Sequence, residues 1–191
     1  MLGNESTPVP VPLTGVPVPH PPYGMYGPSG ARSRGCPPAR FDMAEPGAGN
    51  LAYGLTLPSA VATPGIAFWA TESIFGAHGV AEELIEPYLL LVHELAAYAC
   101  LFTGAGEQIQ LTLCRPEGTD PVQVMVYDTH PPHRHRLLAG LCDERRRTTL
   151  TGVPDLVETH RGTWGFGPAH HPAAGTGTWA TLAQAAPTVT T

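Results

Sequence analysis

Two carboxylates stand at positions where they could do chemistry. Glu94 lies within the apolar stretch LLLVHELAAYA, and Asp128 ends the alternating stretch VQVMVYD. A glutamate held out of water among leucines binds its proton more tightly and could act as a general base near neutral pH. An aspartate at a strand end could accept a hydrogen bond from an exocyclic amine. Each residue also has a simpler interpretation, as a surface glutamate or as an aspartate that caps its own turn, and both alternatives stay open.

A group of histidines follows Asp128 in the segment THPPHRHR. Imidazole is a common metal ligand near neutral pH, so His130, His133 and His135 are candidate ligands. No cysteine, aspartate or further histidine stands beside them at the spacing of a structural zinc site, and the pair 170–171 consists of adjacent residues. The spacing therefore predicts no metal site but a basic loop. The arginine run 145–147 extends this loop, either to contact phosphate or an acidic partner or as ordinary solvated charge.

Glycine-rich segments near the end of the sequence, WGFGP and GTGTW, could approach a phosphate through their backbone. The sequence has no lysine, so it contains no Walker A motif, and it has no Rossmann G-x-G-x-x-G pattern. The glycines alone indicate little about nucleotide binding.

The amino-acid composition and the net charge exclude some classes of binding partner. The 191 residues are 42% apolar and only 14% charged, with a formal net charge of −6. This charge argues against nucleic acid, which requires clustered Lys and Arg. The sequence shows no long apolar run typical of a membrane span and no signal-peptide pattern at its start. We therefore expect a cytoplasmic protein without a membrane partner. The four cysteines form no C-x-x-C pair, which favours free thiols over a disulfide framework.

The chain divides by composition into a tail and a domain. Residues 1–50 contain 11 of the 22 prolines, including the run PVPVPLTGVPVPHPP. Such a segment buries too little apolar surface to offset the entropy of ordering it, so we predict a disordered Pro/Gly-rich tail. A ligand for a proline-binding module is the alternative. Residues 51–191 then form a single domain.

Hydrophobic periodicity predicts the elements that must position the candidate residues. The patterns indicate strands at 51–57, 108–115, 122–128, 162–167 and 176–183, and helices at 64–78, 82–102 and 153–160. Thr63 and Pro64 are typical of a helix start, and Gly79 of a helix end. We therefore expect an α/β (α+β) fold, a two-layer sandwich of a mixed sheet with helices on one face.

Taken in order, several motifs resemble the ATP-binding domain of anti-sigma-factor serine kinases, a family within the GHKL superfamily. The second helix of that family usually reads LVVSELVTNAVRHT, and this sequence has LLVHELAAYACLFT. The strand end V-x-D-T-S-P is matched by VYDTHPP, the segment V-E-x-x-A-x-x-W-G by VETHRGTWG, and the final G-G-K-T-V-W-A by AGTGTWA. The resemblance covers about residues 51–183 and implies a histidine-kinase-like, Bergerat-type domain.

The resemblance assigns roles to individual residues. Glu94 matches the catalytic glutamate that activates a water or a serine, and Asp128 matches the aspartate that accepts from the adenine amino group. Tyr98 stands where the family has a Mg²⁺-binding asparagine. The lid glycines are reduced to Gly152 in TLTGVPDLV, and Pro154 would disturb the helix start that faces the phosphates. The late phosphate-binding segment places Gly175 and Gly177 near the nucleotide.

These departures predict a member that is impaired in catalysis. Phosphoryl transfer depends on charge neutralisation by Mg²⁺ and amide donors, and a phenol is a poor Mg²⁺ ligand. We expect a transcription regulator that acts by protein–protein binding in a partner switch, with a sigma factor or an anti-sigma antagonist as its partner. ATP should bind weakly and Mg²⁺ should contribute little. An active protein serine/threonine kinase and an adenine-nucleotide sensor are the alternatives, and a homodimer is left open.

Overall fold

The computed structural model describes residues 45–115, 121–169 and 175–183. Most of the tail expected at 1–50 and the histidine pair 170–171 lie outside the described residues. The described part begins with a 3-10 turn, Ala48–Asn50, followed by five strands and four helices. These are β1 (Ala52–Pro58), α1 (Thr63–His78), α2 (Glu82–Leu101), β2 (Gln108–Cys114), β3 (Gln123–Asp128), α3 (Arg136–Thr149), α4 (Gly152–Thr159), β4 (Thr163–Pro168) and β5 (Thr176–Thr181).

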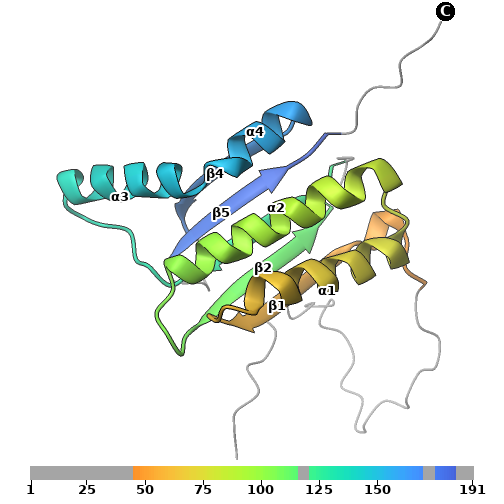
Figure 1. Cartoon of the computed structure of the whole chain (residues 1–191), viewed down its shortest axis with the longest axis horizontal. Coiled ribbons are helices and arrows are strands. Elements are labelled where there is room, and N and C mark those ends of the chain that lie inside the picture. Colours follow the sequence, from red (N-terminus) through yellow and green to blue (C-terminus); the bar gives the residue numbers. More distant parts are fainter. Residues whose placement is uncertain (1–44, 116–120, 170–174, 184–191) are drawn as a thin grey trace, which may run out of the picture. The chain divides into compact units, whose positions relative to one another are not determined.

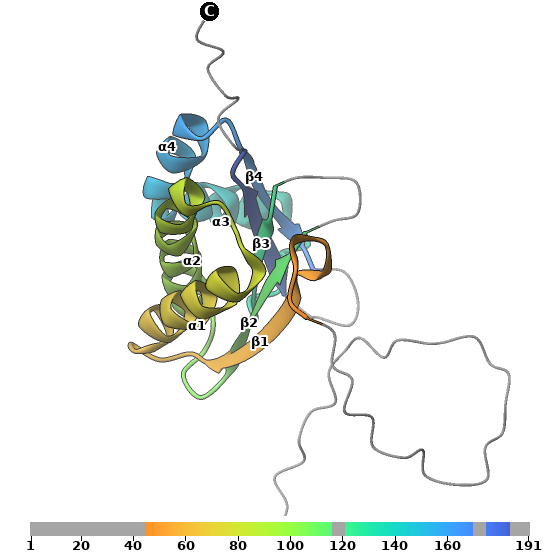
Figure 2. The ribbon, with the colours of Figure 1, turned by 90° about the vertical axis from the view of Figure 1, so that its right-hand side faces the viewer.

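The strands form one sheet in the order β1-β2-β3-β5-β4. All four strand pairs are antiparallel, and Asp128 at the end of β3 pairs with Thr176 at the start of β5. Helices α1 and α2 lie side by side on one face of the sheet (Figures 1 and 2). The expected two-layer α+β architecture is confirmed, with a sheet that is antiparallel throughout its described pairs.

The predicted boundaries of the first helix hold to within one residue at each end. Gly79 ends α1 in a left-handed conformation, with φ of 60°, as a glycine after a helix commonly does. The start differs in one detail, because Ala62 is the N-cap and Thr63 is the first helical residue. The Thr63 hydroxyl instead donates to the Pro58 carbonyl at 2.5 Å, which fixes the turn between β1 and α1.

The folded domain also includes the last residues that the sequence assigned to the tail. The Gly47 carbonyl lies 2.8 Å from Nδ1 of His78, and the other ring nitrogen of His78 lies 2.8 Å from the Tyr53 hydroxyl. These contacts attach the 3-10 turn to β1 and α1.

Helix α2 is the central helix of the core. Nine of its residues are buried, and Leu91, Val92, Leu95 and Ala96 are fully inaccessible. By length and composition alone this helix could cross a membrane. In the structure 44% of this stretch is buried, and its buried side packs against α1 and the sheet.

Tyr88 of α2 connects distant parts of the chain inside the core. Its hydroxyl donates to the Val122 carbonyl, 2.7 Å away, and lies within hydrogen-bond distance of both backbone polar groups of Leu182. Burial raises the pKa of this phenol, which therefore stays a neutral donor. The satisfied hydroxyl fixes how α2 sits on the ends of β3 and β5.

Helix α3 contradicts the basic loop that was expected from the histidine segment through the arginine run 145–147. Residues 129–135 are indeed without regular structure, but a helix of 14 residues follows. Arg146 is the buried residue of this helix, and it is the only one. Its leucines, Leu137, Leu138 and Leu141, do follow helical spacing, but they are exposed. The charged residues around them and the prolines before them favoured a loop instead.

The expectation that Pro154 disturbs the next helix is also wrong. Helix α4 begins at Gly152, so Pro154 occupies its first turn, where the backbone N–H has no intrahelical partner in any case. Val153 and Val157, one turn apart, are buried and hold α4 against the core.

Candidate functional site

Asp128 is buried at the end of β3, and its carboxylate is bound by the chain itself. Arg146 of α3 donates from one terminal nitrogen to Oδ2 at 2.6 Å and from the other to Oδ1 at 3.2 Å. The backbone N–H of His130 donates to Oδ1 at 2.9 Å. Side-chain exposure is only 2% for Arg146 and 1% for Asp128. A bidentate, desolvated guanidinium therefore occupies the acceptor that the resemblance assigns to adenine.

Aromatic rings complete the surroundings of the Arg146 guanidinium. It lies 4.3 Å from the centre of the Phe102 ring and donates a hydrogen bond to the Tyr98 hydroxyl. Burial lowers the pKa of Arg146, but the hydrogen bonds and charge of Asp128 outweigh this effect and hold it above its ordinary value. Arg146 is therefore a permanent cation with an anionic, a phenolic and an aromatic partner.

Tyr98 is buried on α2, in the position that the resemblance gives to a metal-binding asparagine. Its ring packs against Phe102 with centroids 4.9 Å apart. Burial raises the pKa of its phenol, so the hydroxyl stays protonated near neutral pH. The tyrosine thus supplies a neutral hydroxyl to Arg146 and fills space with its ring.

Glu94 lies one turn before Tyr98 on α2, but it is not desolvated. Its side chain is 54% exposed, and a carboxylate oxygen lies 3.8 Å from Nδ1 of the neighbouring His93. Of the two interpretations left open by the sequence, the surface glutamate is correct. The structure therefore does not bring Glu94 together with Asp128 in an enclosed site.

The glycines expected near a phosphate have different surroundings. Gly175 has a φ of +108°, and a Cβ atom built on it would lie 1.9 Å from the Asp128 carbonyl oxygen. A Cβ on Gly177 would lie 3.1 Å from the Tyr127 ring, whereas Gly152 faces open space. Gly175 is thus required by its positive φ and by the close approach of the β3 backbone, whereas a side chain at Gly177 would need the Tyr127 ring to shift by a few tenths of an ångström.

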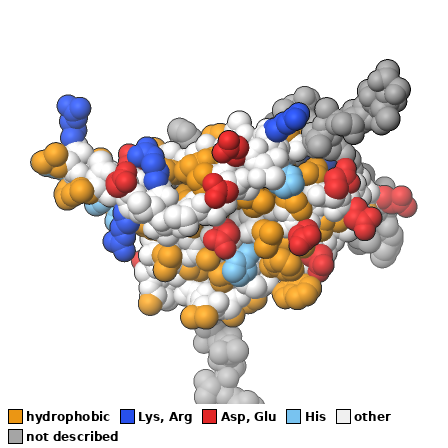
Figure 3. All heavy atoms as spheres, turned by 45° about the horizontal axis from the view of Figure 1, so that its top comes forward, with side chains coloured by type: hydrophobic (Ala, Val, Ile, Leu, Met, Phe, Trp, Pro, Cys, Tyr) orange, Lys and Arg blue, Asp and Glu red, His pale blue; other side chains and the backbone are white. Residues whose placement is uncertain are grey.

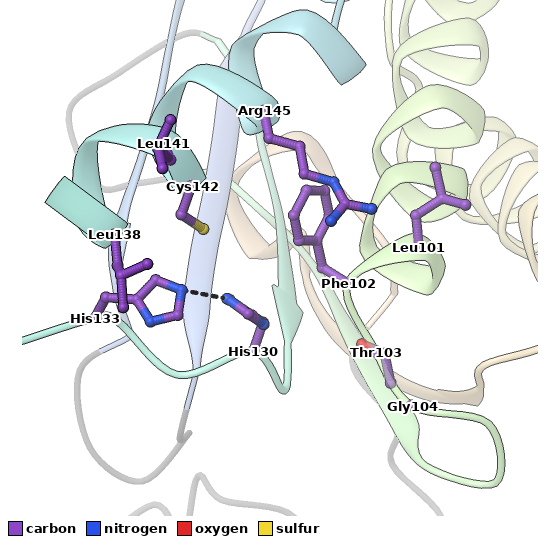
Figure 4. Close-up of a pocket in the computed structure, with 10 residues that line it drawn as sticks. All are labelled: Leu101, Phe102, Thr103, Gly104, His130, His133, Leu138, Leu141, Cys142 and Arg145. Carbon is purple, nitrogen blue, oxygen red and sulfur yellow. Dashed lines mark hydrogen bonds between the residues drawn. The ribbon is translucent and has the colours of Figure 1, made fainter.

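A pocket of about 410 Å³ lies beside the buried pair, between the end of α2, the loop after β3 and the inner side of α3. Figure 4 shows its lining, with the imidazoles of His130 and His133 facing each other and the Cys142 sulfur directed toward them from α3. The two Nε2 atoms lie 3.1 Å apart. Burial, aided by the charge of Arg146, lowers the pKa of His130, so its ring is neutral near pH 7. His135, the third histidine of the segment, is the N-cap residue of α3 and is exposed.

Sequence reasoning missed two residues of this region, Arg146 and Cys142. They are one helical turn apart, so they share the inward face of α3 once that helix forms. The only available signal was the spacing of Leu138, Cys142 and Arg146, four residues apart each time. That spacing has meaning only after the segment is recognised as a helix.

What this chain does is inferred from its structure, because comparison with known protein families and curated proteins gives no match. No protein-family model matches this chain, and no curated protein matches it.

Proposed function

We propose that this chain is a non-catalytic regulator that resembles anti-sigma-factor serine kinases and acts by binding another protein in a cytoplasmic partner switch. The observation that carries the proposal is the Arg146–Asp128 pair. A carboxylate that already accepts three hydrogen bonds from its own chain, and whose side chain is only 1% exposed, leaves no accessible acceptor for an adenine amino group.

The residues at the expected ATP and Mg²⁺ positions do not fit those ligands. Tyr98 offers a protonated phenol where a metal ligand would be required, and its hydroxyl is already bonded to Arg146. The Arg146 guanidinium bonds both Tyr98 and Asp128, so a cationic group lies against the residue at the expected Mg²⁺-binding position. Phosphoryl transfer requires a metal and preorganised donors around the phosphates, and this arrangement opposes both.

An exposed apolar surface on α3 supports the protein-binding part of the proposal. Leu137 and Leu141 are one turn apart and are 73% and 69% exposed. Figure 3 shows hydrophobic side chains gathered at the outer end of α3, next to basic side chains. Large apolar side chains grouped on a polar surface are typical of protein interaction sites. We infer that α3 is the element that contacts the partner.

Nucleotide binding tests the first half of this proposal. We expect ATP or ADP at about 1 mM, with or without Mg²⁺, to raise the melting temperature of the full chain by less than about 2 °C. The reason is that the gain in stability from a ligand present near its Kd is only about 0.4 kcal/mol. Differential scanning fluorimetry measures this shift, and a phosphorylation assay with labelled ATP checks for transfer. A shift of about 10 °C at micromolar ATP that disappears in Asp128→Asn would show an intact nucleotide site and contradict the proposal.

Partner binding tests the second half. The full chain would be assayed pairwise, without nucleotide, against the sigma factors and anti-sigma antagonists of its own genome. We expect at least one of them to bind, and the double variant Leu137→Glu/Leu141→Glu to weaken that binding by more than about tenfold. A tenfold loss is about 1.4 kcal/mol, and loss of an interface hot spot costs about 2 kcal/mol or more. Leu90→Glu is the matched control, since Leu90 is an exposed leucine of α2, 49% accessible. Equal loss in both variants, or no partner in the panel, would count against the proposed role.

A further inference from the structure

We propose that His130, His133 and Cys142 form a binding site for a zinc-class divalent cation. The two imidazoles come from the loop after β3, and the thiol comes from α3. One ligand atom from each residue lies within 4.8 Å of the other two. Figure 4 shows all three side chains directed toward a common point at the edge of the pocket. Neither the resemblance nor the proposed function assigns a role to this group.

The spacing of the ligand atoms suits a single tetrahedral ion. Zinc binds imidazole nitrogen at about 2.0–2.1 Å and thiolate sulfur at about 2.3 Å, which places two nitrogen ligands about 3.3 Å apart. The Nε2 atoms of His130 and His133 are 3.1 Å apart in the structure. The same bond lengths place a thiolate about 3.6 Å from each nitrogen. The Cys142 sulfur lies within 4.8 Å of both nitrogens, so the exposed His133 ring and the Cys142 side chain must close by up to about 1 Å when an ion binds.

Contacts within the chain already hold two of the ligands in position. The His130 N–H donates to Asp128, and its carbonyl accepts from the Thr176 hydroxyl at 3.2 Å. Cys142 is one turn before Arg146, whose buried ion pair fixes α3. Because His130 and Cys142 are already held in place, metal binding needs to order only the His133 side chain, which lowers its cost in conformational entropy.

The donor set determines the kind of ion. Two imidazoles and a thiolate are ligands for zinc and similar transition metals, whereas Mg²⁺ prefers oxygen ligands. On binding, the Cys142 thiol releases its proton to solvent. In the Nε2–Nε2 hydrogen bond one of the two imidazoles carries its hydrogen on Nε2. When the ion binds, that ring carries its hydrogen on Nδ1 instead, so both Nε2 lone pairs face the ion. Three protein ligands leave the fourth position of a tetrahedral ion open to the pocket.

A bound ion would join α3 to the loop that follows β3. At present Arg146 is the buried side chain of α3, and the other described residues of this helix are half-buried or exposed. A metal at Cys142 adds a second attachment one turn away. Trypsin provides a readout, because Arg134 and Arg136 are exposed at the start of this segment. Metal should slow cleavage at these arginines, and a chelator should restore it.

The direct test is a titration of the reduced full chain with Co²⁺, followed by displacement with Zn²⁺. We expect thiolate-to-cobalt charge-transfer absorption together with the intense visible bands of four-coordinate Co²⁺. Cys142→Ser and His133→Gln should each lower the affinity for Co²⁺ by more than about tenfold. Loss of a residue that only hydrogen-bonds to a metal ligand already costs about tenfold, and loss of the ligand itself should cost more. Cys100→Ser and His135→Gln are the matched controls and should keep the wild-type affinity.

Two results would overturn the site. One is charge-transfer absorption that survives in Cys142→Ser, since another cysteine would then be the ligand. The other is an affinity in His133→Gln that stays within about threefold of wild type. His133 is exposed, so His133→Gln keeps the test decisive even if circular dichroism shows that Cys142→Ser does not fold. Metal binding is measured without nucleotide or partner, so failure here is independent of the proposed regulatory function.

Discussion

Arg146→Ala is expected to destabilise the domain by about 3–5 kcal/mol, because it leaves the Asp128 carboxylate buried without its cation. The loss includes both charge-assisted hydrogen bonds to Asp128 and the packing of the guanidinium on Phe102. Chemical unfolding of the full chain, followed by circular dichroism, measures the change. For a domain of this size the melting temperature should fall by roughly 10–17 °C.

Two further variants show whether the effect comes from the buried pair. Arg145→Ala removes an exposed neighbour that also lies over Phe102, at 5.7 Å, and should cost about 1 kcal/mol or less. Arg146→Met/Asp128→Leu removes both charges together and should recover most of the stability, since apolar replacement of a buried ion pair is often neutral. If Arg146→Ala is no more harmful than Arg145→Ala, the pair is not a structural element of this domain.

Gly175→Ala should cost at least about 3 kcal/mol, since a positive φ is already strained for alanine and the new Cβ meets backbone. The atom in its way is the Asp128 carbonyl oxygen, 1.9 Å from the built Cβ. A backbone atom cannot rotate aside as a side chain can, so β3 and β5 would have to separate at this point. The same unfolding experiment measures the effect.

Gly167→Ala is the matched control for this substitution. Gly167 lies in β4, and a Cβ built there has nothing within 4 Å. The change should fall within about 1 kcal/mol of wild type and could be stabilising, since glycine is unfavourable in strands. Similar losses in both variants would mean that general strand propensity, rather than the contact with Asp128, sets the requirement for glycine.

The sequence predicted those elements that bury an apolar face. The alternating strands, the two long helices and the turn at Gly79 all follow from patterns that reflect burial or backbone conformation. The candidate site was predicted only in part. Asp128 was found because it ends a recognisable strand, but its partner was not, because Arg146 lies in a run of three arginines. Successive helical residues point about 100° apart, so Arg146 turns inward while Arg145 and Arg147 stay exposed.

The same reasoning explains the other differences. Glu94 stands in an apolar sequence, yet an apolar helix need not be covered on every side, and this glutamate lies on the uncovered side. Cys142 had no recognisable spacing to the histidines, because its approach to them depends on α3, a helix without a buried apolar stripe. Sequence patterns report burial of apolar surface, and here the site is built around buried charge.

The strand order has a consequence for how the protein is made. Strand β5 follows β4 in the chain but lies between β3 and β4 in the sheet. Until residues 176–181 have left the ribosome, the outer edge of β3 has no described partner and exposes unpaired N–H and C=O groups. Strands β1 to β3 can pair earlier, but completion of the sheet must wait until β5 has been synthesised. A nascent chain stalled before residue 176 would carry a strand edge open to aggregation, which makes this interval the one in which a chaperone matters most.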